Sequence, residues 1–346
     1  MTAGPGSRPG RLGVGVVGAG RVGAVLGSAL GGAGHPVVGV SAVSEASRER
    51  AAVLLPGVPV LEVPEVVRRA ELVLLAVPDD ALAPLVQGLA DTGAWQAGQI
   101  VVHTSGRFGT DVLAPARGRG VIPLALHPAM TFTGTSLDLS RIVGCAFAVT
   151  APAPVLPIGQ ALVVEIGGEP VVVDEAQRPL YHAGLAHGAN HLVVLVAQAA
   201  QALRAAGVEE PGRVLRPLLE AALDSALRAE DGAGDGGAGA VCALTGPVRR
   251  GDAGTVADHV AVLSALGATS GAVDVPVVYG ALSRAATARA LSAGLVGADA
   301  AQRVLDALAG INPAPPALQQ DDTGTSAPGT PGPTDDDGGT PPQEDA

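Results

Sequence analysis

Short apolar runs alternate with helical stretches through the first half of the chain. The runs are rich in β-branched residues and occupy 12–17, 36–41, 71–77, 99–105, 121–127, 144–150 and 169–174. They do not alternate between apolar and polar residues, which is typical of strands buried on both faces, and intervening helices imply parallel connections. The pattern therefore predicts an α/β domain with a doubly wound parallel sheet over 11–175, the last run forming an edge strand.

Helical periodicity takes over after residue 175. The stretch from Arg178 to Gly207 is expected to form one long helix, with Pro179 near its start and Gly207 as its stop. Further helical patterns cover 214–229, 252–266, 276–294 and 299–310. We therefore expect an all-helical second domain over 176–310.

Three segments have a composition that does not favour a folded core. Residues 1–10 and 311–346 are rich in Pro, Gly and either Ser or acidic residues, and we expect them to be disordered. The glycine-rich stretch 231–240 is expected to be a flexible insertion between helices. No apolar stretch of signal-peptide length follows the first residues, and no run reaches the ~18–20 apolar residues of a membrane span.

Charge and cysteine usage narrow the class of protein further. The formal charge is −12, but seven acids lie in 311–346, where there is no basic residue, so the rest of the chain carries −5. No basic stripe that would bind nucleic acid is visible. Cys145 and Cys242 are isolated, which is typical of a reducing cytoplasm. All 21 basic residues are Arg, so no Lys is available for catalysis.

The first strand leads into a glycine-rich turn, "GVVGAGRVG". In this G-x-G-x-x-G pattern the first Gly permits a tight turn, and the second lets the backbone approach a pyrophosphate. The third lets the helix pack closely against the strand. The helix N-terminus adds amide donors for the phosphates. We therefore predict a Rossmann-type dinucleotide site whose loop consists of Gly18, Ala19, Gly20, Arg21, Val22 and Gly23.

The end of the second strand bears on the choice of cofactor. An acidic residue there usually holds the ribose hydroxyls of NAD. Here Ser41 and Ser44 occupy this stretch and Arg48 follows, whereas Glu45 is an acidic residue that would favour NAD. Hydroxyls and a guanidinium suit a 2′-phosphate, so the sequence favours NADP over NAD.

Polar residues follow three of the other predicted strands, in "AVPDD" (76–80), "HTSGRFG" (103–109) and "LHPAMTF" (126–132). Ligands of open parallel sheets bind beyond the carboxyl ends of the strands. We expect Val77 and Pro78 to run under the nicotinamide ribose, and His103, Ser105 and His127 to meet a substrate. The alternative is that each polar side chain merely caps a helix or closes a turn.

The long helix carries His182, His187, Asn190 and His191 in an otherwise Ala- and Leu-rich stretch. At about 100° per residue, His187 and Asn190 lie on the same side, about one turn apart. His187 and His191 have the spacing of a metal pair, but no Glu lies between them and no third ligand is obvious, so we expect no metal. These residues predict one wall of a polar cleft.

A last candidate lies in "LTGPVRRGD" (244–252), which is expected to be a loop that runs into a helix at Thr255. A turn before a capped helix explains this stretch without any function. The alternative is that Arg249 or Arg250 holds a substrate carboxylate in bidentate fashion.

Six blocks of the sequence together resemble the Rossmann-like proteins whose helical C-terminal half is a domain of unknown function. The blocks are, in order, "GVVGAGRVG", "LLAVPDD", "VVHTSGRFG", "LHPAMTF", "YHAGLAHGANHL" and "LTGPVRRGD", and the resemblance covers about residues 11–310. That family is related to β-hydroxyacid dehydrogenases, pyrroline-5-carboxylate reductases and ketopantoate reductases, and some members are thought to be alternative ketopantoate reductases. The resemblance implies a 6-phosphogluconate-dehydrogenase-like helical domain, a nicotinamide cofactor on the first domain, a substrate between that domain and the long helix, and a homodimer joined through the helical domain.

This sequence departs from its relatives in the group that handles the proton. The β-hydroxyacid dehydrogenases and the better-known ketopantoate reductases use a Lys on the long helix, with an Asn one turn later. Asn190 is in a position to keep the second role, but the absence of Lys requires another acid. A His, with an ordinary pKa near ~6.5, is the natural substitute.

The sequence thus predicts a cytoplasmic, NADP-dependent oxidoreductase that reduces a small 2-oxo acid such as ketopantoate. We expect His187 or His127 to be the general acid, and Asn190 and Ser105 to orient the carbonyl group as donors. His103, His182 and one of the two arginines at 249–250 complete the expected contacts with the carboxylate substrate. The alternative is a sensor that binds NAD(P) without catalysis, which needs the glycine turn alone.

Overall fold

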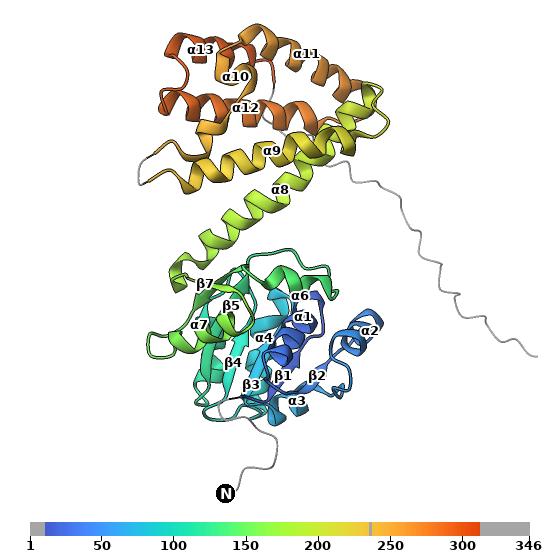
Figure 1. The fold of residues 1–346 in the computed structure, drawn as a ribbon, viewed down its shortest axis with the longest axis vertical. Helices are drawn as coiled ribbons and strands as arrows, with labels where there is room; N and C mark the ends of the chain where they lie inside the picture. Colours follow the sequence, from blue (N-terminus) through green and yellow to red (C-terminus); the bar gives the residue numbers. More distant parts are fainter. Residues whose placement is uncertain (1–10, 235–236, 312–346) are drawn as a thin grey trace, which may run out of the picture. The chain divides into compact units, whose positions relative to one another are not determined.

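The computed structural model describes residues 11–234 and 237–311, which form two compact units (Figure 1). The units divide between Leu195 and Val196, within the long helix α8 (Arg178–Ala205). The expected boundary at 175/176 stays a prediction, and Arg178, the first residue of α8, is hydrogen-bonded to residues of the first unit.

The first unit is built on a seven-stranded sheet with the order β2-β1-β3-β4-β5-β6-β7. Each predicted run coincides with one strand, although β5 extends one residue beyond its run to Pro128, and β7 lies at the edge, as predicted. One part of the expectation is wrong: β6 runs antiparallel to β5, so the sheet is mixed rather than wholly parallel. The strands are β1 Val14–Val17, β2 Val37–Ser41, β3 Leu72–Leu75, β4 Ile100–His103, β5 Ile122–Pro128, β6 Ala146–Thr150 and β7 Glu169–Val172.

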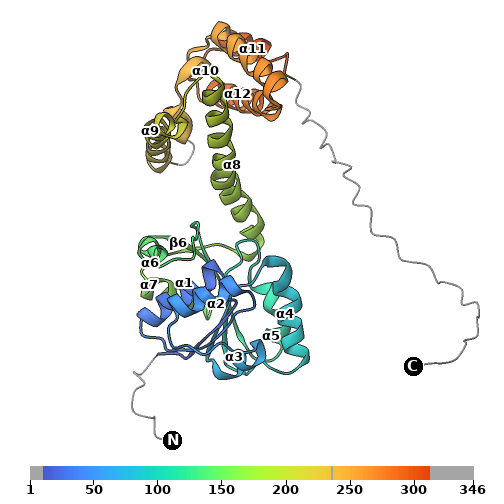
Figure 2. The same cartoon turned by 90° about the vertical axis from the view of Figure 1, so that its right-hand side faces the viewer.

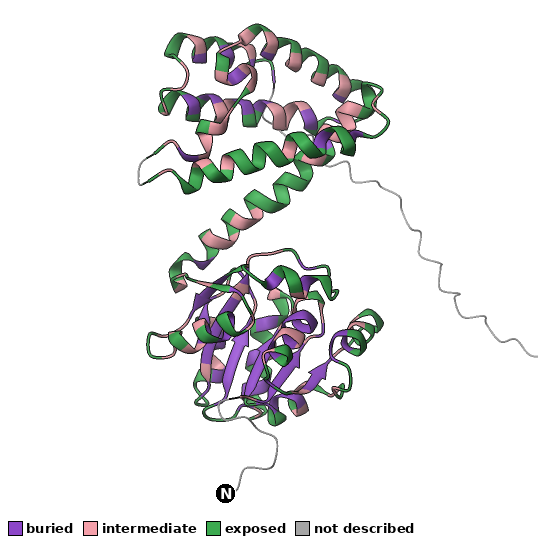
Figure 3. Ribbon diagram, viewed as in Figure 1, coloured by how far each residue is buried: buried purple, intermediate pink, exposed green. Residues whose placement is uncertain are grey.

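Helices cover both faces of this sheet, and Figure 2 shows α4 and α5 on one side and α1, α6 and α7 on the other. Strand β3 shows why its run is apolar throughout: Leu72 and Leu74 pack into one core cluster, whereas Val73 and Leu75 pack into the other. The central strands are accordingly buried along their length (Figure 3). The helices are α1 Arg21–Gly32, α2 Glu45–Leu54, α3 Val63–Arg69, α4 Asp79–Asp91, α5 Ala114–Arg117, α6 Leu137–Ile142 and α7 Leu156–Glu165, with 3₁₀ turns η1 Thr110–Leu113 and η2 Glu175–Gln177.

The second unit is helical, as predicted, and begins with the last turns of α8. Gly207 stops that helix in a left-handed conformation, with φ of 89°. Its helices pack around a small apolar core that includes Val256 and Leu308. The elements are α9 Pro211–Asp231, η3 Gly239–Ala243, α10 Gly246–Arg250, α11 Ala253–Ser270, α12 Asp274–Ser292 and α13 Ala298–Ala307.

The stretch 244–252 corrects one expectation. It contains the short helix α10 rather than only a loop, with Pro247 in its first turn. The next helix begins at Ala253, where the Asp252 carboxylate accepts a hydrogen bond from the Thr255 amide at 3.0 Å. The N-cap chemistry therefore starts this helix at Ala253, within the helical pattern expected over 252–266 and two residues before Thr255.

The segments expected to be mobile are described only in part. Residues 1–10, 235–236 and 312–346 lie outside the described residues. Ile311, expected to belong to the tail, is instead 5% exposed and packs into the core of the second unit, so the folded part extends one residue further. Within 231–240, the Glu230 carboxylate accepts a hydrogen bond from the Ala240 amide at the start of η3.

None of the helices described within 11–234 and 237–311 is long and apolar enough to cross a membrane.

Candidate functional site

The glycine turn after β1 has the geometry that a dinucleotide requires. Gly18 has φ of 95°, and a Cβ there would lie 2.6 Å from the Ala76 carbonyl oxygen. A Cβ at Gly23 would lie 2.1 Å from the Gly18 oxygen, so α1 packs tightly against the turn. At Gly20, by contrast, the nearest atom to a Cβ is 4.0 Å away. This open space at the N-terminus of α1 fits the approach of a pyrophosphate to the backbone.

Ser41 and Ser44, expected to read the cofactor, both have structural tasks. The Ser41 hydroxyl is buried and accepts a hydrogen bond from the Gly18 amide at 3.0 Å, so it holds the turn from the end of β2. Ser44 is the N-cap of α2 and accepts from the Ser47 amide at 3.2 Å. Arg48 is exposed on α2.

Sequence reasoning missed Arg50, on the same helix as Arg48. Its guanidinium donates to the Ala19 carbonyl oxygen at 3.0 Å, within the glycine turn itself. A Cβ at Gly134 would lie 2.7 Å from Arg50 Nε and 3.2 Å from Arg21 Cα. The segment after β5 therefore packs against both Arg50 and the first residue of α1. Two positive side chains accordingly lie beside the turn.

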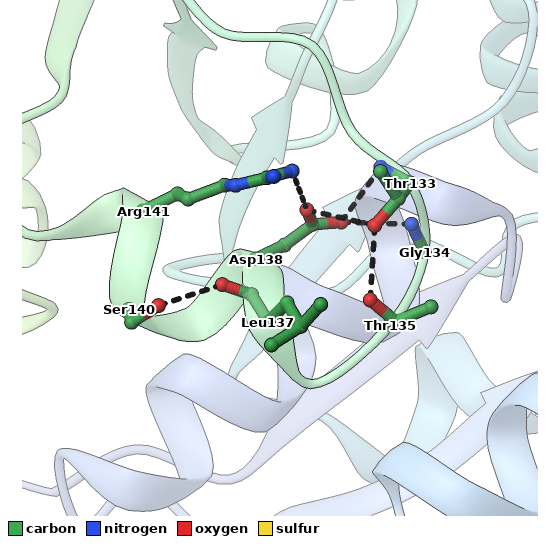
Figure 4. Close-up of polar contacts among 7 residues, drawn as sticks. All are labelled: Thr133, Gly134, Thr135, Leu137, Asp138, Ser140 and Arg141. Carbon is green, nitrogen blue, oxygen red and sulfur yellow. Dashed lines mark hydrogen bonds and ion pairs between the residues drawn. The ribbon is translucent and has the colours of Figure 1, made fainter.

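Asp138 holds that segment in place (Figure 4). Its carboxylate is fully buried and accepts hydrogen bonds from the amides of Thr133 and Gly134 at 2.8 and 2.7 Å and from the Thr133 hydroxyl at 2.9 Å. Arg141 approaches it at 3.3 Å. Burial alone would raise the pKa of the Asp138 carboxyl, but these hydrogen bonds outweigh it and hold the pKa below its usual range. The carboxylate thus fixes a loop that touches the glycine turn.

Arg178, at the start of α8, is buried against the segment that follows β4 and against β5 and β6. Its guanidinium donates to the carbonyl oxygens of Ser105, Ala125 and Ala148 at 3.2, 2.8 and 3.0 Å, and to the Thr150 hydroxyl at 2.8 Å. Among the described residues, no carboxylate forms an ion pair with it. Burial lowers the pKa of Arg178 to about 10, so the group stays cationic at neutral pH. The strand ends therefore carry a buried positive charge.

His127, at the end of β5, meets the first turn of α8. Its Nδ1 lies 3.0 Å from the Tyr181 hydroxyl, and its ring packs edge-on against those of Tyr181 and His182, with centroids 5.6 and 6.1 Å apart. A Cβ at Gly106 would lie 2.9 Å from His127 Nε2 and 2.5 Å from His182 Cδ2. Burial, and then the charge of Arg178, lower the pKa of His127 to about 4, so the ring is neutral at pH 7. The structure thus brings His127 together with His182 and, unexpectedly, with Tyr181, whereas the carbonyl oxygen of Ser105 is bonded to Arg178.

His103 has a different position from the one expected. It has no exposed surface, and its Nε2 donates to the Gly109 carbonyl oxygen at 2.7 Å while its Nδ1 accepts from the Ser105 amide at 3.2 Å. Burial lowers the pKa of His103 to about 4, which keeps the ring neutral. His103 therefore holds the turn after β4 and does not face a ligand. The Ser105 hydroxyl in turn accepts from the Phe108 amide at 3.3 Å.

The remaining candidates lie apart from this cluster or in the other unit. His187, Asn190 and His191 are exposed on α8, and the two histidine Nδ1 atoms are 2.9 Å apart. Val77 lies against the glycine turn, with Cγ1 3.4 Å from the place of a Cβ at Gly18, and Pro78 is the N-cap of α4. Arg249 and Arg250 lie on α10 of the second unit, where Arg249 donates to the Leu295 carbonyl oxygen. Over 11–234 and 237–311, no three His, Cys, Asp or Glu residues are grouped to hold a metal.

Comparisons with known families agree with this two-part construction. A family model of the Rossmann-like domain matches residues 2–128. The model of DUF2520, a domain of unknown function, matches residues 145–286. The N-terminal part of the chain thus matches the Rossmann-like domain and the part after it matches DUF2520, as the resemblance of its sequence blocks predicted. No curated protein matches the sequence significantly.

Several solved structures share the fold. A protein from Bacteroides fragilis assigned to the NADP oxidoreductases has 22% identity and a TM-score of 0.62, over 80% of this chain and 98% of its own. Protein TM1727 from Thermotoga maritima has 20% identity and a TM-score of 0.58, over 81% of this chain and 98% of its own. An imine reductase from Myxococcus stipitatus in complex with NADP⁺ has 19% identity and a TM-score of 0.55, over 85% and 99%. At these identities the likeness establishes the fold.

Proposed function

We propose that this protein is an NAD(P)H-dependent reductase of a small molecule that carries a carbonyl group. The observation that supports it is that two sites share one edge of the sheet. β1, β3, β4 and β5 are mutually parallel neighbours, so the glycine turn after β1 and the polar groups after β4 and β5 lie at the same carboxyl edge. A sensor would need only the first of these sites.

In this proposal the glycine turn binds the cofactor, and the polar groups after β4 and β5 contact the substrate. Gly18, Gly20 and the N-terminus of α1 would hold the pyrophosphate of a nicotinamide dinucleotide, and Val77 would flank it. The bound cofactor supplies a hydride. Reduction of a carbonyl group builds negative charge on its oxygen, which needs a proton and hydrogen-bond donors. His127, Ser105 and the residues of α8, including His187 and Asn190, are proposed to provide them.

We further propose that the substrate is a 2-oxo acid, with ketopantoate as one candidate. A buried guanidinium without a carboxylate partner, as at Arg178, creates a positive potential that favours an anionic ligand.

The experiment is to follow NADPH oxidation by the purified full-length protein against a panel of 2-oxo acids that includes ketopantoate, with cyclic imines as a second panel. Turnover of a 2-oxo acid supports the proposal. Turnover of imines alone would retain the reductase and refute the substrate class. NADPH binding without turnover in either panel would refute the reductase and favour the sensor.

We propose NADP as the preferred cofactor. Arg48, Arg50 and the capping hydroxyl of Ser44 offer positive charge and donors near the end of β2. Dissociation constants for NADPH and NADH, measured by titration of the same preparation, decide the question. NADH binding as tightly as NADPH would overturn the preference.

We propose a cytoplasmic homodimer, joined through the helical part of the chain. Large apolar side chains on α8 and α9 are exposed, with Val193 69% and Leu218 64% accessible. Burial of such side chains against a second copy would remove them from water, at about 25 cal/mol per Å² of apolar area. Sedimentation of the wild type and of a Val193→Glu variant would test this, because a dimer should dissociate and a monomer should not change.

A further inference from the structure

Tyr181, in the first turn of α8, contacts His127 at the end of β5, although the sequence predicts no role for it. Its hydroxyl lies 3.0 Å from His127 Nδ1, and the two rings meet at 86°. Tyr181 is half-buried, and it follows the fully buried Arg178 by three residues on the same helix. A hydroxyl, an imidazole and a guanidinium therefore lie in succession at the carboxyl edge of the sheet.

The other groups around this pair leave the ring of His127 neutral. Besides burial, the Arg178 charge and the neighbouring imidazoles of His182 and His103 lower the pKa of His127, and the Asp79 carboxylate raises it. Burial is the largest cause, and the resulting pKa of about 4 leaves about one imidazolium in a thousand at pH 7. His127 is therefore a poor direct source of a proton, but a neutral imidazole can take a proton at one nitrogen while it releases one at the other.

Tyr181 has the opposite character. Burial raises the pKa of its hydroxyl, so the phenol keeps its proton at neutral pH. The Arg178 charge opposes that rise, because it stabilises the phenolate. Gly106 keeps the space between the two histidine rings free of any side chain.

We propose that the Tyr181 hydroxyl is the proton donor of this site, with His127 as its hydrogen-bonded relay and Arg178 as a positioning residue. The inference rests on the proposed reductase function. As the substrate oxygen gains negative charge, a new O–H bond forms to it while the Tyr181 O–H bond breaks, and the electron pair of that bond stays on the phenolate. The proton on His127 Nδ1 then passes to the phenolate, and Nε2 takes a proton from a solvent water molecule, which leaves a hydroxide ion in the solvent, so the ring ends neutral as the Nε2–H tautomer.

The chain contains a matched control for the loss of this hydroxyl. It has two tyrosines, and the second, Tyr279, lies 3.0 Å from Nδ1 of His259 in the second unit, with rings 5.8 Å apart. Tyr181→Phe and Tyr279→Phe each remove one hydroxyl from a tyrosine–histidine pair, and the two pairs have similar geometry. We expect kcat to fall by roughly 10²–10⁴ in Tyr181→Phe, with the NADPH dissociation constant unchanged. Tyr279→Phe should stay within about twofold of the wild type.

A second readout follows the ionisation of Tyr181 directly. In Tyr279→Phe the only tyrosine left is Tyr181, so its phenolate absorbance can be titrated without interference. We expect a pKa above the ordinary value of about 10, and an alkaline fall in kcat at that same pKa. In this background, Arg178→Gln should raise the Tyr181 pKa further, whereas Arg178→Lys, which keeps the charge, should raise it less. His127→Asn should lower kcat without changing KM.

The outcomes separate the two proposals. Absence of turnover by the wild type refutes the reductase, and the proton donor with it. Turnover that persists in Tyr181→Phe, with the chemical step shown to be rate-limiting by deuterated NADPH, refutes the donor alone. Loss of turnover in His187→Gln but not in Tyr181→Phe would assign the proton to His187 instead. An alkaline limb of kcat that does not coincide with the Tyr181 titration also overturns the inference.

Discussion

A single methyl group at Gly23 should disrupt the glycine turn. The Cβ of an alanine would lie 2.1 Å from the Gly18 carbonyl oxygen and 2.8 Å from Ala76 Cβ. The first obstacle is a backbone atom of the turn itself, so no side-chain rotation can relieve the clash. Helix α1 would have to move away from β1 by about 1 Å to restore a normal contact.

The expected change in the free energy of unfolding of Gly23→Ala is the sum of two opposing effects. Overpacking of a close contact costs about 1–3 kcal/mol, and a backbone obstacle places Gly23→Ala at the upper end. Replacing Gly by Ala within a helix returns about 0.5–1 kcal/mol. We therefore expect the free energy of unfolding to fall by about 2 kcal/mol. Since the shift displaces the amides at Gly20 and Arg21, NADPH affinity should fall by at least about tenfold, which corresponds to ~1.4 kcal/mol.

The assay can use the single tryptophan, Trp95, which is buried in the first unit and so reports the unfolding of that unit in urea. Gly31→Ala, on the same helix, is the matched control, because its Cβ would meet nothing closer than Val37 Cγ2 at 3.7 Å. That variant should be as stable as the wild type or more so, by up to about 1 kcal/mol. If Gly23→Ala unfolds like Gly31→Ala and binds NADPH as tightly, the steric argument is wrong.

Three further predictions follow from buried groups and from the composition of the tail. His103 is neutral and buried with a pKa of about 4, below the ~6.5 of the unfolded chain, so its contribution to stability is complete above pH 6.5 and is lost as the pH falls toward 4. The free energy of unfolding should change by about 3 kcal/mol over this window, and urea unfolding of His103→Gln should depend less on pH than that of the wild type. An equal pH dependence in the two proteins would contradict the neutral, buried state of His103. Asp138→Asn should lose about 1–3 kcal/mol and weaken NADPH binding through the loop at Gly134, whereas unaltered binding would show that the loop does not support the turn. Removal of residues 312–346 should leave Tm unchanged, while removal of Ile311 as well should lower it by several degrees; a matching loss in the shorter truncation would show that the tail contributes to folding.

Much of the fold can be predicted from the sequence because the signals are local. Runs of β-branched residues, the glycine turn and Gly207 each specify backbone conformation within a few positions. The antiparallel pairing of β5 with β6 could not be predicted in this way. Both strands are buried apolar runs, and their relative direction depends on the route of the chain between them.

The sequence by itself determined the strands, the long helix and the presence of a dinucleotide turn, along with the histidines and the serine that follow the strands. Only the tertiary structure decided which neighbours those polar residues contact. His103 and His127 lie at the ends of neighbouring strands, yet His103 has no exposed surface and holds a turn, while His127 contacts Tyr181. Arg178 shows why such contacts cannot be predicted from a local pattern, since its hydrogen-bond partners lie 28 to 73 positions away along the chain. Burial, pKa and hydrogen bonding depend on such distant neighbours, and no pattern within a few residues encodes them.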